Sequence, residues 1–362
     1  MRVVICGGGV IGACTAYFLG QRGAEAVVVE RTGVACAASG KSGGFLALDW
    51  CDGTPLAALA RRSFALHAEL AAAFGSWDYR RLDTLAVAAS ARRSLRATGG
   101  LPGWVAREAA LQQQLGTTRT TAQIHPERFT RGMMDAAIAA GARLQIGEVT
   151  GLLRHADRVA GVLVDGAPLG ADAVVIALGP WSLLACAWLP LPMVYGLKGH
   201  SVVLRTGVAV TPHALFVEYE AEDGAAHAPE VFPRPDGTTY VCGLSSEAPL
   251  PLDPAAVATD GMAQAKLRAM IRGFAPGLAD AEAVAAQACY RPVTRDGLPL
   301  MGRVSGVAGA YVATGHSVWG MLNGPATGET MAELIADGRT SLDIAAFDPA
   351  RLPALPADAV RA

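Results

Sequence analysis

Residues 3–12 read Val-Val-Ile-Cys-Gly-Gly-Gly-Val-Ile-Gly, and residues 27–30 read Val-Val-Val-Glu. An apolar run, a glycine turn, a helical segment and a second apolar run ending in an acid are typical of a βαβ dinucleotide-binding unit. Gly7 permits the tight turn, Gly9 lets a pyrophosphate approach the backbone, and Gly12 lets the helix pack against the strand. The helix directs its free N–H groups at the phosphates, and Glu30 is placed to accept hydrogen bonds from a ribose. The sequence therefore predicts that the chain binds an adenine dinucleotide.

Composition limits the class of protein. The chain has 362 residues, 52% of them apolar, which suits about two domains with a sizeable core. A net charge of −2 argues against a nucleic-acid partner, which requires a basic face. The seven cysteines include no Cys-x-x-Cys pair, which indicates a reducing compartment and no metal site. Because the first strand is expected from Val3, no leader is expected, and a cytoplasmic location is predicted.

The chain reads as an α/β nucleotide domain interrupted by a second domain. Alternating apolar residues between 199 and 243 predict an antiparallel sheet, 90–116 is expected to be helical, and a last helix is expected from about Pro325 to Asp337. We assign residues 1–48, 121–188 and 286–362 to the nucleotide domain, and 49–120 and 189–285 to a substrate or cap domain. The uncharged stretch 173–197 is cut by Gly179-Pro180, Pro190 and Pro192, so no membrane insertion is expected.

Four separated segments resemble one superfamily, the FAD-dependent amine and amino-acid oxidases that include glycine oxidase, sarcosine oxidase and D-amino-acid oxidase. These segments are residues 3–30, 38–44, 174–181 (Val-Val-Ile-Ala-Leu-Gly-Pro-Trp) and 311–328 (Tyr-Val-Ala-Thr-Gly-His-Ser-Val-Trp-Gly-Met-Leu-Asn-Gly-Pro-Ala-Thr-Gly). The resemblance spans the chain in the family's order. It implies the glutathione-reductase-type FAD fold, with a Rossmann-like FAD-binding domain and an antiparallel β-sheet substrate domain, and it implies FAD rather than NAD.

The resemblance also implies which residues contact FAD. The expected contacts are Gly7, Gly9, Val10, Ile11, Gly12, Glu30, Arg31, Ser39, Lys41, Ser42, Gly43, Gly44, Val149, Ala177, Gly179, Trp181, Cys289, Gly315, His316, Gly320, Met321 and Leu322. A helix that starts after Gly320–Leu322 would direct its N–H groups at the flavin edge that gains charge on reduction. His316 and Trp319 would border the same ring. For His316, the alternative is a structural histidine bonded to backbone.

Residues 289–302, Cys-Tyr-Arg-Pro-Val-Thr-Arg-Asp-Gly-Leu-Pro-Leu-Met-Gly, resemble the segment of glycine oxidase that binds the substrate carboxylate. Arg291 matches its arginine, whose planar fork binds a carboxylate through two hydrogen bonds, so the substrate is expected to be an amino or imino acid. The alternative is a surface or ion-paired arginine. Cys289 lies where monomeric sarcosine oxidases attach FAD covalently. Its alternative role is that of a small buried hydrophobe.

Two further positions bear on the chemistry. Asp49, in Asp-Trp-Cys-Asp-Gly, is a candidate to hold the substrate amine, and the alternative is a capped turn before a helix. Four residues fall on the predicted sheet of the second domain and are further pocket candidates: Tyr195, Lys198, His200 and Tyr240. Sarcosine oxidases place an oxygen-activating lysine where this chain has Val241.

The resemblance implies hydride transfer from the carbon that bears nitrogen to flavin N5, with an imine as product and O₂ reduced to hydrogen peroxide. Two alternatives stay open. One is a dehydrogenase that passes electrons to a quinone or another carrier. The other is a flavoprotein that holds FAD as a structural core and acts as a non-catalytic interaction module.

Overall fold

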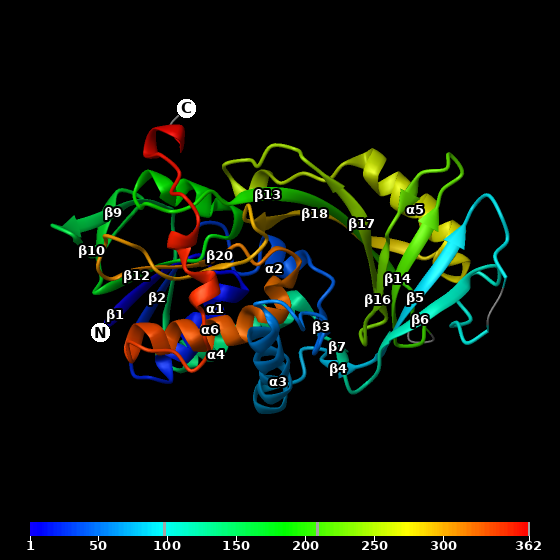
Figure 1. Cartoon of the computed structure of the whole chain (residues 1–362), viewed down its shortest axis with the longest axis horizontal. Helices are drawn as coiled ribbons and strands as arrows, with labels where there is room; N and C mark the ends of the chain where they lie inside the picture. Colours follow the sequence, from blue (N-terminus) through cyan, green and yellow to red (C-terminus); the bar gives the residue numbers. More distant parts are fainter. Residues whose placement is uncertain (97–98, 208–209, 361–362) are drawn as a thin grey trace.

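The computed structural model describes residues 1–96, 99–207 and 210–360, and Figure 1 shows two adjoining halves. The nucleotide half is built on a six-stranded sheet of order β19-β20-β12-β1-β2-β8. All neighbours pair in parallel except β19 and β20. The strands are β1 (Arg2–Cys6), β2 (Glu25–Glu30), β8 (Arg143–Ile146), β12 (Ala173–Ile176), β19 (Leu300–Arg303) and β20 (Ala310–Thr314).

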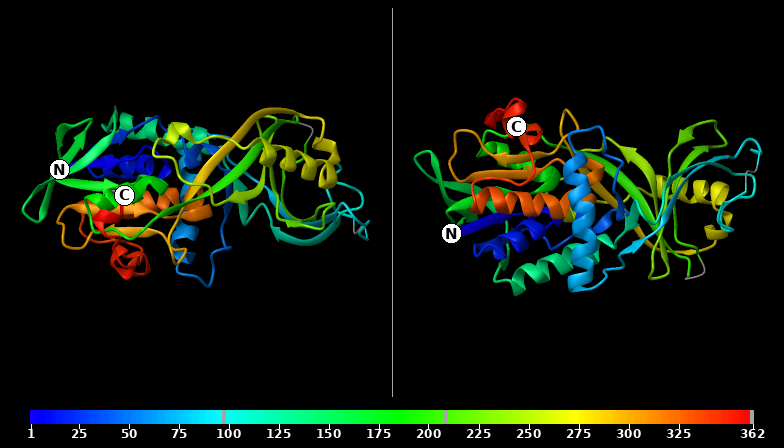
Figure 2. Two further views of the ribbon diagram at one scale, coloured as in Figure 1. Left: turned by 90° about the horizontal axis from the view of Figure 1, so that it is seen from above. Right: turned by 60° about the horizontal axis from the view of Figure 1, so that its bottom comes forward.

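Layers cover both faces of this sheet, which explains why its strands are continuous apolar runs. One face packs on α1 (Val10–Gly20), α4 (Pro126–Ala139) and α6 (Gly320–Ala336), and α3 (Ala57–Phe74) lies across α6 (Figure 2). The other face packs on a three-stranded sheet of β9 (Val149–His155), β10 (Arg158–Val164) and β11 (Ala167–Gly170). Along β1, Val3 and Ile5 enter the helical core, whereas Val4 and Cys6 enter the other.

The cap half is an eight-stranded sheet with the main order β18-β13-β17-β16-β14-β5-β6, antiparallel except between β5 and β14. Its strands are β5 (Asp83–Ser90), β6 (Ala110–Gly116), β13 (Tyr195–Arg205), β14 (His213–Glu220), β15 (Ala226–His227, paired with β14), β16 (Glu230–Pro233), β17 (Thr238–Ser246) and β18 (Glu282–Val293). The helix α5 (Gly261–Phe274) covers the face that carries Val241. Tyr240 and Cys242 lie on the opposite face, which looks toward the nucleotide half.

Short elements join the halves. A three-stranded sheet of β3 (Phe45–Ala47), β7 (Thr121–Gln123) and β4 (Arg80–Arg81) lies between them, and α2 (Ala38–Lys41) follows the first βαβ unit. Short 3₁₀ segments are Gly179–Ala187, Pro254–Ala256, Pro276–Leu278, Ser317–Trp319, Ala345–Phe347, Pro349–Arg351 and Ala357–Val360. Among the described residues, no helix combines the length and apolarity that a membrane crossing requires.

Three features differ from the sequence-based expectations. The segment 90–116 was expected to be helical, but its described part contains the strand β6, because pairing with β5 outweighs helix propensity. The last helix begins at Gly320 rather than near Pro325. The expected domain boundaries also cut through packed units: β18 runs across residue 286, and α3, assigned to the cap, packs in the nucleotide core because its apolar face meets α6.

Candidate active site

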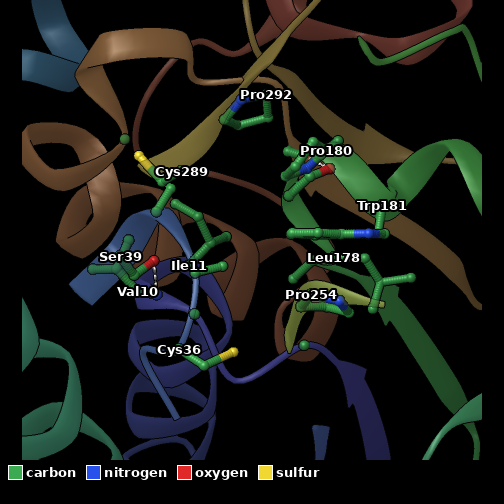
Figure 3. Close-up of a pocket in the computed structure, with 18 of the residues that line it drawn as sticks. Val10, Ile11, Cys36, Ser39, Leu178, Pro180, Trp181, Pro254, Cys289 and Pro292 are labelled. Carbon is green, nitrogen blue, oxygen red and sulfur yellow. Dashed lines mark hydrogen bonds between the residues drawn. The ribbon is translucent and has the colours of Figure 1, made fainter. Parts of the chain in front are cut away.

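A single pocket runs from the first βαβ unit to the cap sheet. Val10, Ile11, Ser39 and Cys36 face Leu178, Pro180, Trp181 and Pro254 across it, with Cys289 and Pro292 toward one end (Figure 3). The loops after β1, β2 and β12 supply one end, and β13, β16, β17 and β18 supply the other. The first end lies at the carboxyl ends of parallel strands, where ligands of open α/β sheets bind.

The glycine turn after β1 lies so close to neighbouring backbone that side chains would not fit, and its backbone forms a cradle at the pocket. Gly7 has φ 114°, and a Cβ there would lie 2.4 Å from the Ala177 carbonyl oxygen. A Cβ on Gly12 would lie 2.0 Å from the Gly7 carbonyl oxygen, so this glycine sets the contact between α1 and the turn. A Cβ on Gly9 would lie 3.0 Å from Ser39 Oγ and would fill the pocket wall.

Polar side chains hold this turn in shape. The Gly8 N–H donates to Glu30 Oε2 (2.7 Å), and the Thr32 N–H donates to Glu30 Oε1 (2.9 Å). The Val10 N–H donates to Ser39 Oγ (2.9 Å), which ties the loop after β2 to the start of α1. Oε1 also accepts from the Gly33 N–H (3.3 Å) and the Cys36 thiol (3.9 Å), whereas Oε2 has the Gly8 N–H as its one donor among the described residues. Oε2 therefore remains able to accept a hydrogen bond from a ligand hydroxyl.

Helix α6 contains a proline near its start, and side chains from α3 complete this end of the helix. Pro325 has no N–H, so the Met321 carbonyl lacks its usual helical donor. His67 Nε2 lies 2.9 Å from that carbonyl oxygen, and the Ala326 N–H donates to Ser63 Oγ (3.0 Å). Burial lowers the pKa of His67 to about 4, so the ring is neutral at pH 7 and Nε2 carries its proton. Two α3 side chains one turn apart therefore fix the end of α6 that borders the pocket.

His316 lines the pocket from the turn before α6. Its Nε2 lies 3.0 Å from Thr327 Oγ1, and that hydroxyl donates to Met301 Sδ (3.7 Å), so Nε2 is the donor. Burial lowers the pKa of His316 to about 3. The side chain is therefore neutral at physiological pH and presents no charge to the pocket.

A loop of the cap half closes the nucleotide end. Trp181 Nε1 donates to the Pro251 carbonyl (2.7 Å), and Arg31 Nη1 donates to the Leu252 carbonyl (3.1 Å). Leu252 and Pro254 line the pocket. The loop after β17 thus contacts the residue that follows Glu30 and forms a strap across the halves.

The cap end carries a positively charged side chain. Arg291, on β18, extends across Gly199 of β13, where a Cβ would lie 3.3 Å from the Arg291 Cζ. Its Nη1 donates to Ser245 Oγ (2.8 Å) on β17. Gly199 therefore leaves the face of β13 open for the guanidinium, which lines the pocket beside Cys289.

An acidic side chain stands on the same wall. Glu230 of β16 pairs in register with Cys242 of β17, and the Cys242 thiol donates to Glu230 Oε2 (3.5 Å). Burial raises the pKa of Glu230, and the Arg291 guanidinium offsets part of the rise. Burial also raises the pKa values of Tyr240 and Cys289, which keeps the phenol and the thiol protonated.

The pocket includes most of the predicted contacts. It is lined by Gly7, Gly9, Val10, Ile11, Glu30, Arg31, Ser39, Ser42, Gly43, Val149, Ala177, Gly179, Trp181, Cys289, Arg291, His316, Gly320 and Met321. Of the four candidates on the cap sheet, His200 and Tyr240 line it as well, whereas Tyr195 and Lys198 lie outside the lining. The sequence analysis missed the parts played by Glu230, Gly199, Ser245 and the strap; a glycine within a strand was the available signal for Gly199.

Other predicted residues lie outside the lining. Gly12, Gly44, Gly315 and Leu322 pack behind it, and Lys41 and Trp319 are half-buried beside it. Asp49 also lies outside. Its carbonyl accepts from the Asp52 N–H (3.1 Å) in a turn before α3, and Asp52 binds Arg61. Asp49 therefore stands in a turn before α3, outside the pocket lining, and the start of α3 has no side-chain cap.

FAD fits these residues. The glycine cradle and the N-terminus of α1 suit a pyrophosphate, and Glu30 keeps acceptor capacity for a ribose. Ser42 Oγ lines the pocket, is buried and has no hydrogen-bond partner among the described residues, so a ligand can supply one. The start of α6 and neutral His316 border the remaining pocket surface.

Comparison with known proteins places the chain in a class. A family model described as FAD dependent oxidoreductase, DAO, matches residues 2–334. The protein is an FAD-dependent oxidoreductase with FAD as its cofactor. More specifically, the chain belongs to the DAO family, which confirms the predicted resemblance and fold class.

Relatives match nearly the whole chain. An oxidoreductase of Schizosaccharomyces pombe is 30% identical, with 96% of this chain and 97% of the relative covered. A glycine oxidase of Pseudomonas aeruginosa is 28% identical, with 96% and 98% covered. The crystal structure of a glycine oxidase from Geobacillus kaustophilus is similar at a TM-score of 0.82 and 25% identity, with 96% and 98% covered.

Proposed function

We propose that this enzyme oxidises the C–N bond of an amino acid or a secondary amine to an imine that then hydrolyses, with O₂ as the electron acceptor and hydrogen peroxide as product. The observation that carries the proposal is that Arg291 lies in the same pocket as the glycine cradle. FAD supplies the acceptor for the hydride when bound. The names of the glycine oxidase relatives support the same reaction class.

The side chains have distinct roles in this proposal. Arg291 binds the substrate carboxylate through its planar fork, Ser245 accepts a hydrogen bond from the guanidinium, and Gly199 leaves room for it. Neutral His316 adds no charge, so a carboxylate near it meets no second cation. Tyr240 stays protonated and provides a neutral hydroxyl on the wall. Fixing the carboxylate orients the C–N bond, which lowers the barrier by positioning rather than by a strong base.

Anaerobic mixing of the holoenzyme with D-, L- and N-methyl amino acids and with plain amines tests this function. We expect at least one carboxylated amine to bleach the flavin absorbance, followed by detection of the corresponding keto acid or aldehyde. If no member of the panel bleaches the flavin, the proposal is wrong, and the non-catalytic interaction module becomes the better explanation.

A dehydrogenase is the second candidate, because none of the described residues that line the pocket is a lysine. Val241, which stands at the position of the oxygen-activating lysine, is fully buried in the core under α5 instead. Peroxide formed in equal amount to imine under air identifies an oxidase. Turnover only with a quinone or an artificial dye identifies a dehydrogenase.

A further inference from the structure

Glu230 is a carboxylate on the pocket wall with few hydrogen-bond donors. Among the described residues its carboxylate accepts one side-chain hydrogen bond, from the Cys242 thiol at 3.5 Å, and a thiol is a weak donor. The aromatic side chains of Phe232 and Tyr240 lie on neighbouring positions of β16 and β17. A carboxylate in such surroundings is costly unless a cation or several donors compensate it.

Arg291 does not supply this compensation directly. Within the described part of the chain the two side chains form no ion pair, although the guanidinium acts on the carboxyl electrostatically. Arg291 donates to Ser245 instead and extends over Gly199 from β18, whereas Glu230 projects from β16. The strand order β18-β13-β17-β16 separates them across the sheet, and both line the pocket. A ligand with both charges can therefore lie between them.

We propose that Glu230 is a specificity-determining residue that accepts a hydrogen bond from a protonated nitrogen of the substrate, while Arg291 binds its carboxylate. This inference rests on the proposed function and narrows the substrate to amino acids whose nitrogen is free to carry a proton. N-acyl amino acids lack such a nitrogen, and dicarboxylic amino acids bring a second negative charge toward Glu230, so both are disfavoured.

The nitrogen has two possible positions in a substrate: the amine that is oxidised, or a second amine in the side chain. Both offer the same chemistry to Glu230. In the first case the substrate ammonium transfers one proton to the Glu230 carboxylate. The bound substrate is then the neutral amine that oxidation requires, and Glu230 holds the proton. In the second case Glu230 only binds the side chain. Monoamino and diamino acids distinguish the two.

The test compares wild-type holoenzyme with Glu230→Gln by anaerobic flavin reduction, which separates the dissociation constant from the limiting rate. For the substrate identified above we expect Kd to rise about 10- to 100-fold in the variant, because the acceptor loses its negative charge and the hydrogen bond from the ammonium is weakened. For acetate, followed by its perturbation of the flavin spectrum, we expect Kd to stay constant or fall. An equal effect on glycine, sarcosine, lysine and ornithine assigns the reacting amine, whereas an effect confined to lysine and ornithine assigns the side-chain amine.

Ser245→Ala is the matched control, since it loosens Arg291 and leaves Glu230 in place. Ser245→Ala should raise the Kd of acetate and the Kd of amino acids by similar factors. Glu230→Asp keeps the charge on a shorter side chain, so its Kd for the substrate should lie between those of wild type and Glu230→Gln. This variant keeps the test valid if the glutamine variant does not fold. The inference would be overturned if Glu230→Gln left the Kd values unchanged, or if it raised the Kd of acetate as much as the Kd of amino acids. Wild-type flavin that no amine bleaches would instead overturn the proposed function.

Discussion

The two ends of the pocket are built on different principles. At the nucleotide end, backbone contacts and short hydrogen bonds already engage Gly7, Gly12, Glu30 and Ser39. At the cap end, the carboxylate of Glu230 has one weak donor, and the Nδ1 atom of His200 is buried without a partner among the described residues. These contacts define the shape of the first end before any ligand binds. The second end has polar capacity that only a ligand can complete.

This difference separates cofactor retention from substrate choice. A tightly packed cradle binds one constant group, and small changes there should abolish binding altogether. A wall with spare polar groups should change its ligand preference while the protein still folds and holds FAD. Variants at the two ends should therefore fail in different ways.

The largest effect is expected for Gly7→Ala. The new Cβ would lie 2.4 Å from the Ala177 carbonyl oxygen at a φ of 114°, so the turn must move, at a cost of about 3 kcal/mol or more. We expect purified protein with little FAD, measured by the ratio of absorbance at the flavin and protein bands. Gly33→Ala is the control, because Gly33 also lines the pocket and has open space around it. Full FAD content in Gly7→Ala would show that FAD binding does not depend on the close contact at Gly7.

Arg291→Leu should leave FAD bound and raise Kd for carboxylated amines about 100-fold, since a charge-assisted pair of hydrogen bonds is lost. Plain amines should be nearly unaffected. Rapid-mixing flavin reduction gives both values. The exposed Arg295→Leu, four residues along the chain, controls for the loss of one positive charge. If Arg291→Leu changed the Kd of carboxylated and plain amines equally, Arg291 would not be the residue that binds the substrate carboxylate.

A smaller effect is expected for His67 and depends on pH. The folded pKa of about 4 lies below the unfolded value near 6.5, so the unfolded chain binds more protons and stability falls as the pH drops through this range. Lowering the pH from 6.5 to 5 should remove about 2 kcal/mol through His67. The penalty of His67→Ala should therefore shrink at pH 5, as measured by denaturant unfolding.

Ser63→Ala is the matched comparison for this test. It removes the hydroxyl that accepts from the Ala326 N–H but contains no titrating group. Its penalty, about 1 kcal/mol, should be the same at both pH values. A penalty of His67→Ala that stays constant between pH 6.5 and 5 would show that the ring is not buried in its neutral form.

The smallest effect is expected at the strap. Trp181→Phe removes the hydrogen bond to the Pro251 carbonyl, worth about 1 kcal/mol, and should speed FAD release about fivefold. Trp50→Phe removes a bond of the same type, from Nε1 to the Leu115 carbonyl, away from the pocket. It should lower thermal stability without changing FAD release. Identical release rates in both variants would exclude the strap from FAD retention.

Prediction from sequence succeeded where the signal is local. The glycine spacing, the apolar runs and the acid at Glu30 lie within one βαβ unit, and the inferred FAD cofactor and fold class are confirmed by the family match. It failed where a segment depends on distant partners. The segment 90–116 contains a strand because β5 is available to pair, and the last helix starts before Pro325 because α3 supplies a donor and an acceptor.

The sequence by itself determined the cofactor and the architecture, because the conformational needs of glycine and the burial of apolar runs act over short stretches of chain. Only the tertiary structure decided which polar groups share the pocket. Arg291, Gly199 and Glu230 stand on different strands, and no spacing along the chain predicts that one guanidinium crosses a glycine toward Ser245. Sheet register brings them together, and register is set by the packing of whole strands rather than by any one motif.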